Sequence, residues 1–186
     1  MSNFKADDDS DLNNYRPISL LSSFNRIFEK LMYSRMNSFI DKEGILCSSQ
    51  YGFRQKHSTE HAILDIVSKI QSNMDRGYFS CGVFIDLKNA FDTVNHNILF
   101  QKLEYYGFRG IINEWFSSYL RQRTQVTIVE SQTSEPSSIV CGVPQGSVLG
   151  QLLFLLYFNF ICSSSSKLGF YLFADDTNLL LKLWKK

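Results

Sequence analysis

The chain has 186 residues, of which 44% are apolar and 20% are charged, and its formal net charge is +1. This length and composition suit one domain, or two closely packed lobes, with a sizeable core, and they exclude a disordered chain. A free-standing nucleic-acid-binding protein is usually more basic, so any nucleic acid would contact local charged patches or another domain.

The four cysteines, Cys47, Cys81, Cys141 and Cys162, lie far apart and include no Cys-x-x-Cys pair. Their spacing does not favour a zinc or redox site. Cys81 and Cys141 stand in apolar, strand-like runs, which predicts buried thiols, and an intracellular, reducing compartment is expected. No signal or transit peptide is recognisable, and the apolar stretch 148–162 is shorter than the roughly 20 apolar residues that span a bilayer.

The first half of the chain predicts two helices and a strand after an acidic, solvated lead-in. Pro17 disfavours helix before it, so the segment around it is expected to be extended. Apolar residues at helical spacing predict both helices, the first with Ser23 as its N-cap and both ending at glycines, Gly44 and Gly77. The expected ranges are 1–13 for the lead-in, 14–21 for the extended segment, 24–40 and about 62–77 for the helices, 48–59 for the loop between them, and 79–86 for the strand.

The second half predicts a mixture of helices and strands rather than a regular strand–helix alternation, which indicates the α+β class. Neither GxxxxGK[ST] nor GxGxxG occurs, so the sequence supports neither a Walker ATPase nor a Rossmann enzyme. The expected elements are helices over 89–105, 111–120 and 147–161, strands over 125–130 and 137–142, a loop over 142–150, and a hairpin of 168–174 and 177–183 with Asp175 and Asp176 at its turn.

Two apolar strands of this pattern end in carboxylates. Residues 168–174 lead into Asp175 and Asp176, and residues 81–85 lead into Asp86. Carboxylates at the ends of buried strands are costly unless a cation or hydrogen-bond donors meet them. If the strands are neighbours, Asp86 and Asp175 converge and repel each other. Mg²⁺ relieves such repulsion and prefers one or two carboxylates completed by water and phosphate oxygens, so the pattern points to nucleotide chemistry.

Five sequence blocks occur in an order that resembles a known family. A lone pair of aspartates is a weak signal, whereas five ordered blocks with compatible spacing are a strong one. Together they resemble the reverse transcriptases of non-LTR (LINE-type) retrotransposons, over about residues 14–181. The blocks are NYRPISLL (14–21), QYGFRQKHST (50–59), FIDLKNAFDTVNH (84–96), CGVPQGSVLG (141–150) and FADDT (173–177).

The resemblance implies the fold of a right-hand polymerase, restricted to its fingers and palm. The palm would be an antiparallel sheet backed by helices, and the thumb would be absent. The whole of 1–186 would then be a single reverse transcriptase domain fragment. The fingers would take about 1–78 and part of 97–145, and the palm about 79–96 and 146–186.

The resemblance also implies an RNA-directed DNA polymerase that works by template-directed nucleotidyl transfer. Asp86, Asp175 and Asp176 would be its catalytic carboxylates, and Asp86 and Asp175 would bind two Mg²⁺ ions, for which Mn²⁺ can substitute. One ion would activate the primer 3′-hydroxyl, and the other would neutralise charge on the triphosphate and on the leaving pyrophosphate. The implied partners are an RNA template, a DNA primer and dNTPs, with no membrane.

Five further positions match family residues that contact nucleotide or template. Phe91 matches an aromatic that lies under the sugar and excludes a 2′-hydroxyl by a clash. Arg16 matches a fingers arginine that grips the triphosphate, for which a guanidinium is suited because it binds phosphate in bidentate fashion. Gln145 and Gly146 match the loop that abuts the nucleotide, and Arg54 stands in a block expected to face template or nucleotide.

Some positions depart from the family pattern. Gln151 stands where a proline usually follows the VLG block, Asn159-Phe160 where Asn-Asp is frequent, and Lys88-Asn89 where Ser-Lys is common. None of these changes removes a metal ligand, and together they suggest drift, as in a decayed element copy. Two alternatives therefore stay open: a catalytically dead remnant that acts at most as a nucleic-acid or protein binding module, and a two-metal nuclease or phosphatase.

Overall fold

The structure is a computed structural model that describes residues 2–4, 15–121, 123–129 and 132–184. Most of the predicted acidic lead-in, residues 5–14, lies outside the described residues. The chain forms two compact units, one of Met1–Phe39 with Phe91–Phe154 and the other of Ile40–Ala90 with Leu155–Lys186. The mixture of helices and antiparallel strands confirms the α+β class, whereas the finer division into fingers and palm stays a prediction.

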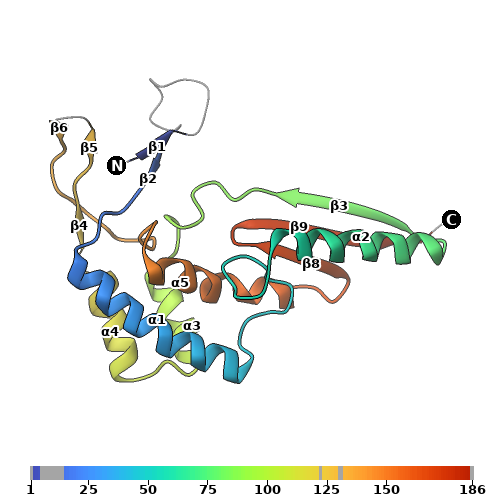
Figure 1. The fold of residues 1–186 in the computed structure, drawn as a ribbon, viewed down its shortest axis with the longest axis horizontal. Coiled ribbons are helices and arrows are strands. Elements are labelled where there is room, and N and C mark those ends of the chain that lie inside the picture. Colours follow the sequence, from blue (N-terminus) through green and yellow to red (C-terminus); the bar gives the residue numbers. More distant parts are fainter. Residues whose placement is uncertain (1, 5–14, 122, 130–131, 185–186) are drawn as a thin grey trace. The chain divides into compact units, whose positions relative to one another are not determined.

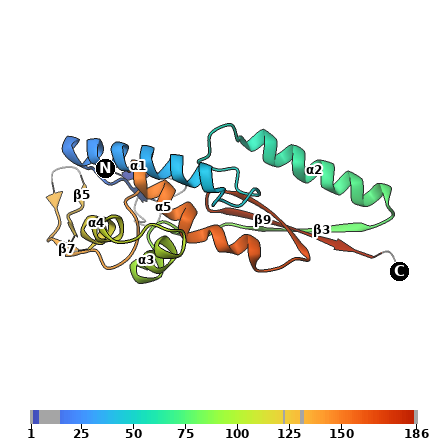
Figure 2. The ribbon, with the colours of Figure 1, turned by 90° about the horizontal axis from the view of Figure 1, so that it is seen from below.

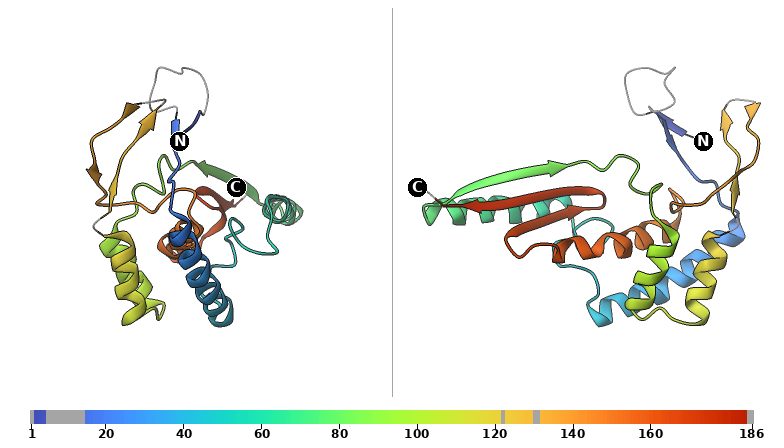
Figure 3. Two further views of the ribbon diagram at one scale, coloured as in Figure 1. Left: turned by 60° about the vertical axis from the view of Figure 1, so that its left-hand side comes forward. Right: turned by 180° about the vertical axis from the view of Figure 1, so that it is seen from behind.

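The first unit is mainly helical, and its helices bury apolar residues at helical spacing. Figure 3 shows α3 and α4 side by side. The apolar helix α5 is buried along most of its length. The helices are α1 (Ser23–Glu43) and α5 (Val148–Phe158), each of which continues past the end of this unit, together with α3 (His96–Tyr105) and α4 (Ile111–Leu120).

Two helices begin at other residues than predicted. The cap of α1 is Ser22 rather than Ser23, because the Ser22 Oγ accepts a hydrogen bond from the Asn25 amide at 3.2 Å. The helix predicted over 89–105 begins only at His96. The Asn95 side chain accepts hydrogen bonds from the backbone amides of Asn97 and Ile98, in the first turn of α3, at 3.0 and 3.1 Å. Within the predicted range, the residues before Asn95 include turns and no helix.

Short antiparallel strand pairs complete the first unit. Strand β1 (Ser2–Phe4) pairs with β2 (Tyr15–Pro17), which adds a strand that the sequence did not predict. The strand predicted over 125–130 is divided, because β4 (Thr124–Gln125) pairs with β7 (Ser137–Ser138), whereas β5 (Ile128–Val129) pairs with β6 (Gln132–Thr133). The strand predicted over 137–142 is shorter than expected, since Gly142 and Val143 instead donate backbone hydrogen bonds to Val94 and Phe91.

The second unit is a three-stranded antiparallel sheet with one long helix, as Figure 1 shows. Helix α2 (Thr59–Asp75) runs along one face of the sheet (Figure 2). The sheet order is β3–β9–β8, and the predicted hairpin of its last two strands is confirmed. Its strands are β3 (Phe79–Ile85), β8 (Leu168–Phe173) and β9 (Asp176–Leu183), and a 3₁₀ segment, Asn159–Ser163, precedes β8.

The cysteines differ from the prediction. Cys81 and Cys141 are exposed rather than buried. Cys81 lies on β3, an edge strand whose side chains are exposed along most of its length, so an apolar run did not mean burial there. Cys47 and Cys162 form a disulfide within the second unit. Among the described residues, no helix is long and apolar enough to cross a membrane.

Candidate active site at the end of the β8–β9 hairpin

The strand register brings two of the predicted catalytic carboxylates face to face. In the β3–β9 ladder Phe84 pairs with Asn178 and Ile85 with Thr177, so the next pair in register is Asp86 and Asp176. Directly opposed residues of an antiparallel pair point to the same face of the sheet. Asp86 and Asp176 therefore lie on the same face at the end of the sheet, whereas the sequence predicts that Asp86 and Asp175 converge.

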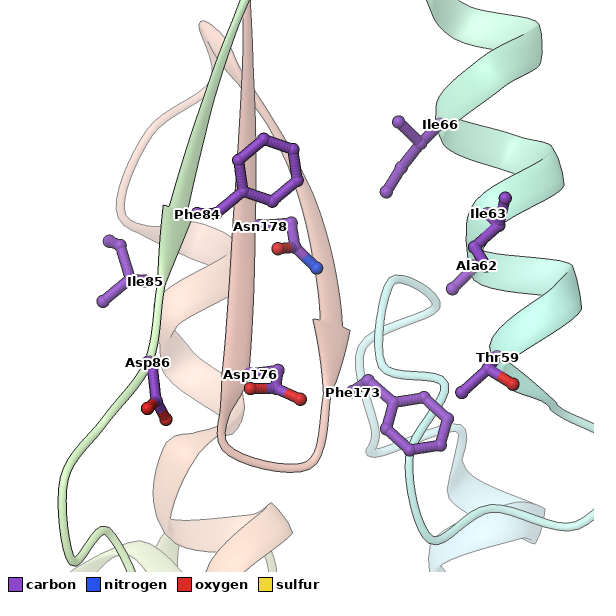
Figure 4. A pocket seen from close by; sticks show the side chains of 10 residues that line it. All are labelled: Thr59, Ala62, Ile63, Ile66, Phe84, Ile85, Asp86, Phe173, Asp176 and Asn178. Carbon is purple, nitrogen blue, oxygen red and sulfur yellow. The ribbon is translucent and has the colours of Figure 1, made fainter. Parts of the chain in front are cut away.

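The two carboxylates line one open pocket of about 330 Å³ between the sheet and α2. Figure 4 shows both at the same end of the pocket, where β3 and β9 reach the hairpin turn. Phe84 and Asn178, two residues further along the strands, line the same pocket, as the two-residue period of a strand requires. The rest of the lining is mostly apolar and comes from Thr59, Ala62, Ile63 and Ile66 of α2 and from Ile85 and Phe173.

The third predicted carboxylate, Asp175, lies in the turn itself. Phe173 pairs with Asp176, so Ala174 and Asp175 form a two-residue hairpin loop. Ala174 has a φ of +58°, which a two-residue hairpin turn requires at its first position and which is costly for a residue other than glycine. Asp175 is half-buried and does not line the pocket that Asp86 and Asp176 share.

The donor set suits a hard divalent cation. Asp86 and Asp176 offer carboxylate oxygens on one face, and Mg²⁺ commonly takes one or two carboxylates and completes its shell with water and phosphate oxygens. Within the described ranges no three His, Cys, Asp or Glu side chains are grouped closely enough to hold a metal ion. The residues thus fit a site of two carboxylates that substrate and water complete, rather than a cage made only of protein ligands.

Arg54 lies in the second unit and holds its own loop. Its Nη1 donates to the carbonyls of Cys47 and Gln50 at 2.9 and 3.2 Å. These bonds tie the start of the 47–54 loop to its end. Its predicted contact with template or nucleotide stays a prediction.

The remaining predicted nucleotide contacts belong to the first unit. Phe91 is half-buried and stacks on Phe154, with ring centroids 4.5 Å apart, and its carbonyl accepts from the Val143 amide at 2.8 Å. The Gln145 side chain donates to the Asp92 carboxylate at 3.1 Å. Their roles toward a nucleotide stay predictions.

The neighbouring Gly146 has a φ of +84°, which favours glycine at this position of the loop. Arg16 is the middle residue of β2, where it pairs with Asn3. The nucleotide-binding roles of both residues also stay predictions.

Sequence reasoning missed two residues that contact the hairpin turn, Gln50 and Gly52. Both lie in the QYGFR block that carried the resemblance, but only Arg54 of that block was assigned a role. The Gln50 side chain hydrogen-bonds the backbone of Ala174, and Gly52 lies against the same residue. In the sequence alone, a glutamine two residues before a glycine does not indicate a functional role. The role becomes recognisable only when the structure shows their contact with Ala174.

Comparisons with known proteins show which family the chain belongs to. Residues 5–185 match the family described as reverse transcriptase (RNA-dependent DNA polymerase). The chain is 38% identical over 149 residues to a "Probable RNA-directed DNA polymerase from transposon BS" of Drosophila melanogaster, and 33% identical over 148 residues to the "RNA-directed DNA polymerase from mobile element jockey" of the same species. These matches cover 77% and 80% of this chain but only 16% of each relative.

A solved structure shares the fold. The apo telomerase of Candida tropicalis, truncated from its C-terminal domain, superposes with a TM-score of 0.58 at 14% identity, over 82% of this chain and 33% of that one. The chain spans about a sixth of the length of its curated relatives, so it corresponds to one part of such proteins. The family match over nearly all residues and the identity to retrotransposon polymerases show that this chain belongs to the reverse transcriptase family.

Proposed function

We propose that this chain carries the polymerase active site of a retrotransposon reverse transcriptase and performs template-directed nucleotidyl transfer, making DNA on an RNA template. One observation carries the proposal: Asp86 and Asp176 line the same pocket at the end of the β8–β9 hairpin, with Asp175 in its turn, in a chain of the reverse transcriptase family. The relatives that it matches are named RNA-directed DNA polymerases of transposons.

In this proposal Asp86, Asp175 and Asp176 hold two Mg²⁺ ions at the strand ends, and Mn²⁺ can substitute. The bound ions would make the primer 3′-hydroxyl a better nucleophile and neutralise charge on the triphosphate. The protein has little covalent chemistry of its own to perform, so its carboxylates act by positioning and by holding charge. The pocket beside them leaves the site open to a large substrate.

The finer architecture belongs to the same proposal. We assign the chain to the fingers and palm of a right-hand polymerase, with the β3–β9–β8 sheet in the palm. RNA template, DNA primer and dNTPs are the proposed partners, and Arg16, Arg54, Gln145 and Gly146 the proposed nucleotide or template contacts. Because these substrates are found inside cells, we also propose an intracellular site of action.

The decisive experiment is primer extension on a homopolymeric RNA template with the complementary dNTP and Mg²⁺. The wild-type chain is expected to extend the primer, and Asp175→Asn is expected to reduce extension to background, because an amide at this position cannot supply the charge that holds the cation. Circular dichroism of both proteins establishes that each is folded.

Two outcomes would overturn the proposal. A folded wild-type chain that extends no better than Asp175→Asn would favour the catalytically dead remnant, whose nucleic-acid binding a gel shift with the same primer–template would then measure. Cleavage of the primer–template without dNTP would favour the two-metal nuclease instead.

Phe91 gives a test of sugar selection. Phe91→Val is expected to lower the preference for dNTP over rNTP roughly tenfold or more, because the smaller side chain leaves room for a 2′-hydroxyl. The measurement is the ratio of kcat/KM for dATP and ATP on the same template.

A matched control separates selection from packing, since Phe91 also stacks on Phe154. Phe108→Val truncates another phenylalanine of the same unit, one that is 3% exposed and packs edge-on against Phe39. It is expected to lower stability but to leave the sugar preference unchanged. An equal preference in wild type and Phe91→Val would refute the sugar-selecting role.

A further inference from the structure

The loop that follows α1 lies beside the hairpin that carries the candidate catalytic carboxylates. Its backbone adds to the edge of β8, where the Leu172 amide donates to the Ser49 carbonyl and the Tyr51 amide donates to the Leu172 carbonyl, both at 2.8 Å. Gln50 forms a parallel bridge with Leu172. The loop is therefore fixed next to the last residues of β8 before the turn.

The side chain of Gln50 continues this contact along the chain to Ala174. Its Oε1 accepts from the Ala174 amide at 3.1 Å and from the Gly52 amide at 2.9 Å, and its Nε2 donates to the Ala174 carbonyl at 3.4 Å. The side-chain amide thus pairs with both backbone polar groups of one residue, as a neighbouring strand would. Two amide donors that point at the same atom identify that atom as the oxygen. Gln50 is only 3% exposed, so these bonds are shielded from water.

The residue that Gln50 holds has an unfavourable backbone conformation. Ala174 is 5% exposed and has a φ of +58°, a region that residues other than glycine occupy only where their surroundings enforce it. It directly precedes Asp175 and lies two residues before Asp176. A change in its backbone angles would rotate both carboxylates relative to Asp86.

Gly52 makes this close approach possible. A Cβ at position 52 would lie 2.2 Å from the Ala174 nitrogen and 2.8 Å from the Phe173 carbonyl carbon, so any other residue would push the turn away. Tyr51, between them, holds the loop to α2 through a hydrogen bond from its hydroxyl to the Asp65 carboxylate. Burial, followed by this hydrogen bond and the charge of Asp65, raises the pKa of Tyr51, so its hydroxyl remains a donor across the physiological range.

We propose that Gln50 is a positioning residue of the active site: by pairing with the backbone of Ala174 it fixes the hairpin turn and thereby the directions of Asp175 and Asp176. The catalytic consequence rests on the proposed polymerase function, whereas the fixing of the turn does not. Gln50 contacts no reacting atom in this proposal and acts only through the turn.

The first arm of the test measures the turn without any activity. In wild type the Ala174 amide is expected to exchange its hydrogen slowly, and in Gln50→Met about tenfold faster, because one buried hydrogen bond is lost while side-chain volume is kept. Gln50→Glu keeps the accepting oxygen and is expected to retain most of the protection. Gln55→Met, an exposed glutamine of the same loop, is the matched control and should leave exchange at Ala174 unchanged.

The second arm measures the chemistry. Primer extension by Gln50→Met is expected to lose roughly 10- to 100-fold in kcat and to need more Mg²⁺ for half-maximal rate, while KM for dNTP changes less than twofold, because a small misplacement of catalytic groups acts on the reacting geometry. A merely structural role would lower the amount of active enzyme and leave the Mg²⁺ requirement unchanged. Gln50→Glu should recover part of the rate.

The outcomes separate this inference from the polymerase proposal. Unchanged Ala174 exchange in folded Gln50→Met would overturn the positioning role whatever the activity. If Gln50→Met does not fold, Gln50→Leu, which also lacks the accepting oxygen, takes its place, and wild-type exchange at Ala174 in that variant would overturn the role. A wild-type chain without extension would refute the polymerase proposal, and the exchange measurement would still decide the positioning role.

Discussion

Replacing Asp86 with asparagine is expected to lower primer extension about 100- to 1000-fold while leaving the metal-free protein slightly more stable than wild type. Activity falls because one of the carboxylates that hold charge at the reacting centre is lost. Stability rises, by about a few tenths of a kcal/mol, because like charges opposite each other across neighbouring strands repel, and the β3–β9 register, extended by one residue beyond Ile85, sets Asp86 opposite Asp176. A substitution that lowers activity but raises stability indicates that these carboxylates serve to bind a cation and do not stabilise the fold.

Thermal unfolding with and without Mg²⁺ checks the same idea without a substrate. A ligand that binds only the folded state raises the melting temperature, so Mg²⁺ is expected to stabilise wild type and to have a smaller effect on Asp86→Asn. Asp75→Asn is the matched control. This carboxylate lies at the exposed end of α2 in the same unit and accepts a hydrogen bond from Gln71 at 2.9 Å. Equal Mg²⁺ effects in all three proteins, or full activity of Asp86→Asn, would contradict the assignment.

The convergence of strand-end carboxylates could be predicted from sequence, but their division between two faces could not. Apolar runs that end at Asp86 and at Asp175-Asp176 predicted a strand and a hairpin, and the structure confirms both. The sequence left open whether that strand lies beside the hairpin, and the ladder shows that β3 pairs with β9. Which aspartate shares a face with Asp86 depends on register, because a shift of one residue moves every side chain to the other face. The structure places Asp176 in the pocket with Asp86, whereas the sequence analysis chose Asp175 as the second metal ligand.

This difference can be resolved by comparing two variants. If the pocket face alone binds the cation, Asp176→Asn should remove the stabilising effect of Mg²⁺ and Asp175→Asn should retain it. If the turn carboxylate also binds, as the resemblance implies, both variants should lose it. The position of Asp175 depends on the backbone of Ala174, so the answer also bears on the role proposed for Gln50.

Helix boundaries were predicted better than helix faces. The apolar spacing located α1 and α2 to within a few residues. In the first half of α1, however, the apolar residues that defined the spacing are mostly exposed: Phe24, Ile27, Phe28 and Leu31 are 56–76% exposed, whereas Glu29 is 1% exposed. The spacing shows that one face of the helix is apolar, but whether that face is buried depends on what packs against it. Glu29 is buried because two polar groups of the first unit bind its carboxylate.

Those two groups explain why Glu29→Ala is expected to lower the free energy of unfolding by about 2–4 kcal/mol, because the substitution removes the acceptor that two donors share. One carboxylate oxygen of Glu29 accepts from the Tyr119 hydroxyl, and the other accepts from the Val148 amide at 2.9 Å. Val148 is the first residue of α5, where the amides lack partners within the helix and the helix dipole favours negative charge. Alanine at position 29 would remove this acceptor from the partly buried Tyr119 hydroxyl and from the first amide of α5.

Chemical denaturation measures the loss, and two variants on the same helix calibrate it. Glu29→Gln keeps an acceptor of the same length, so it should cost less than half as much. Glu43→Ala removes an exposed glutamate near the end of α1, which pairs only with the exposed Lys42, and should change stability by less than about 0.5 kcal/mol. A loss of under about 1 kcal/mol in Glu29→Ala would show that the buried carboxylate is not what holds α5 to α1.

The pH dependence of stability tests the hydrogen bond between Tyr119 and Glu29 through the ionisation of Tyr119. Burial, with the hydrogen bond to Glu29 and the charge of Glu29 as further causes, raises the pKa of Tyr119 above its usual value of 10. The folded state therefore keeps this proton to higher pH than the unfolded state does. The stability that this provides is fully present below pH 10 and is lost as the pH rises from 10 toward the folded pKa. Tyr119→Phe removes the titrating group. Above pH 10 the unfolding free energy of this variant should therefore fall less steeply with pH than that of the wild-type protein. Tyr51 and Tyr171, whose pKa values burial also raises, contribute in the same direction to the slope that remains. An unchanged slope in Tyr119→Phe would mean that Tyr119 ionises no later in the folded protein than in the unfolded chain.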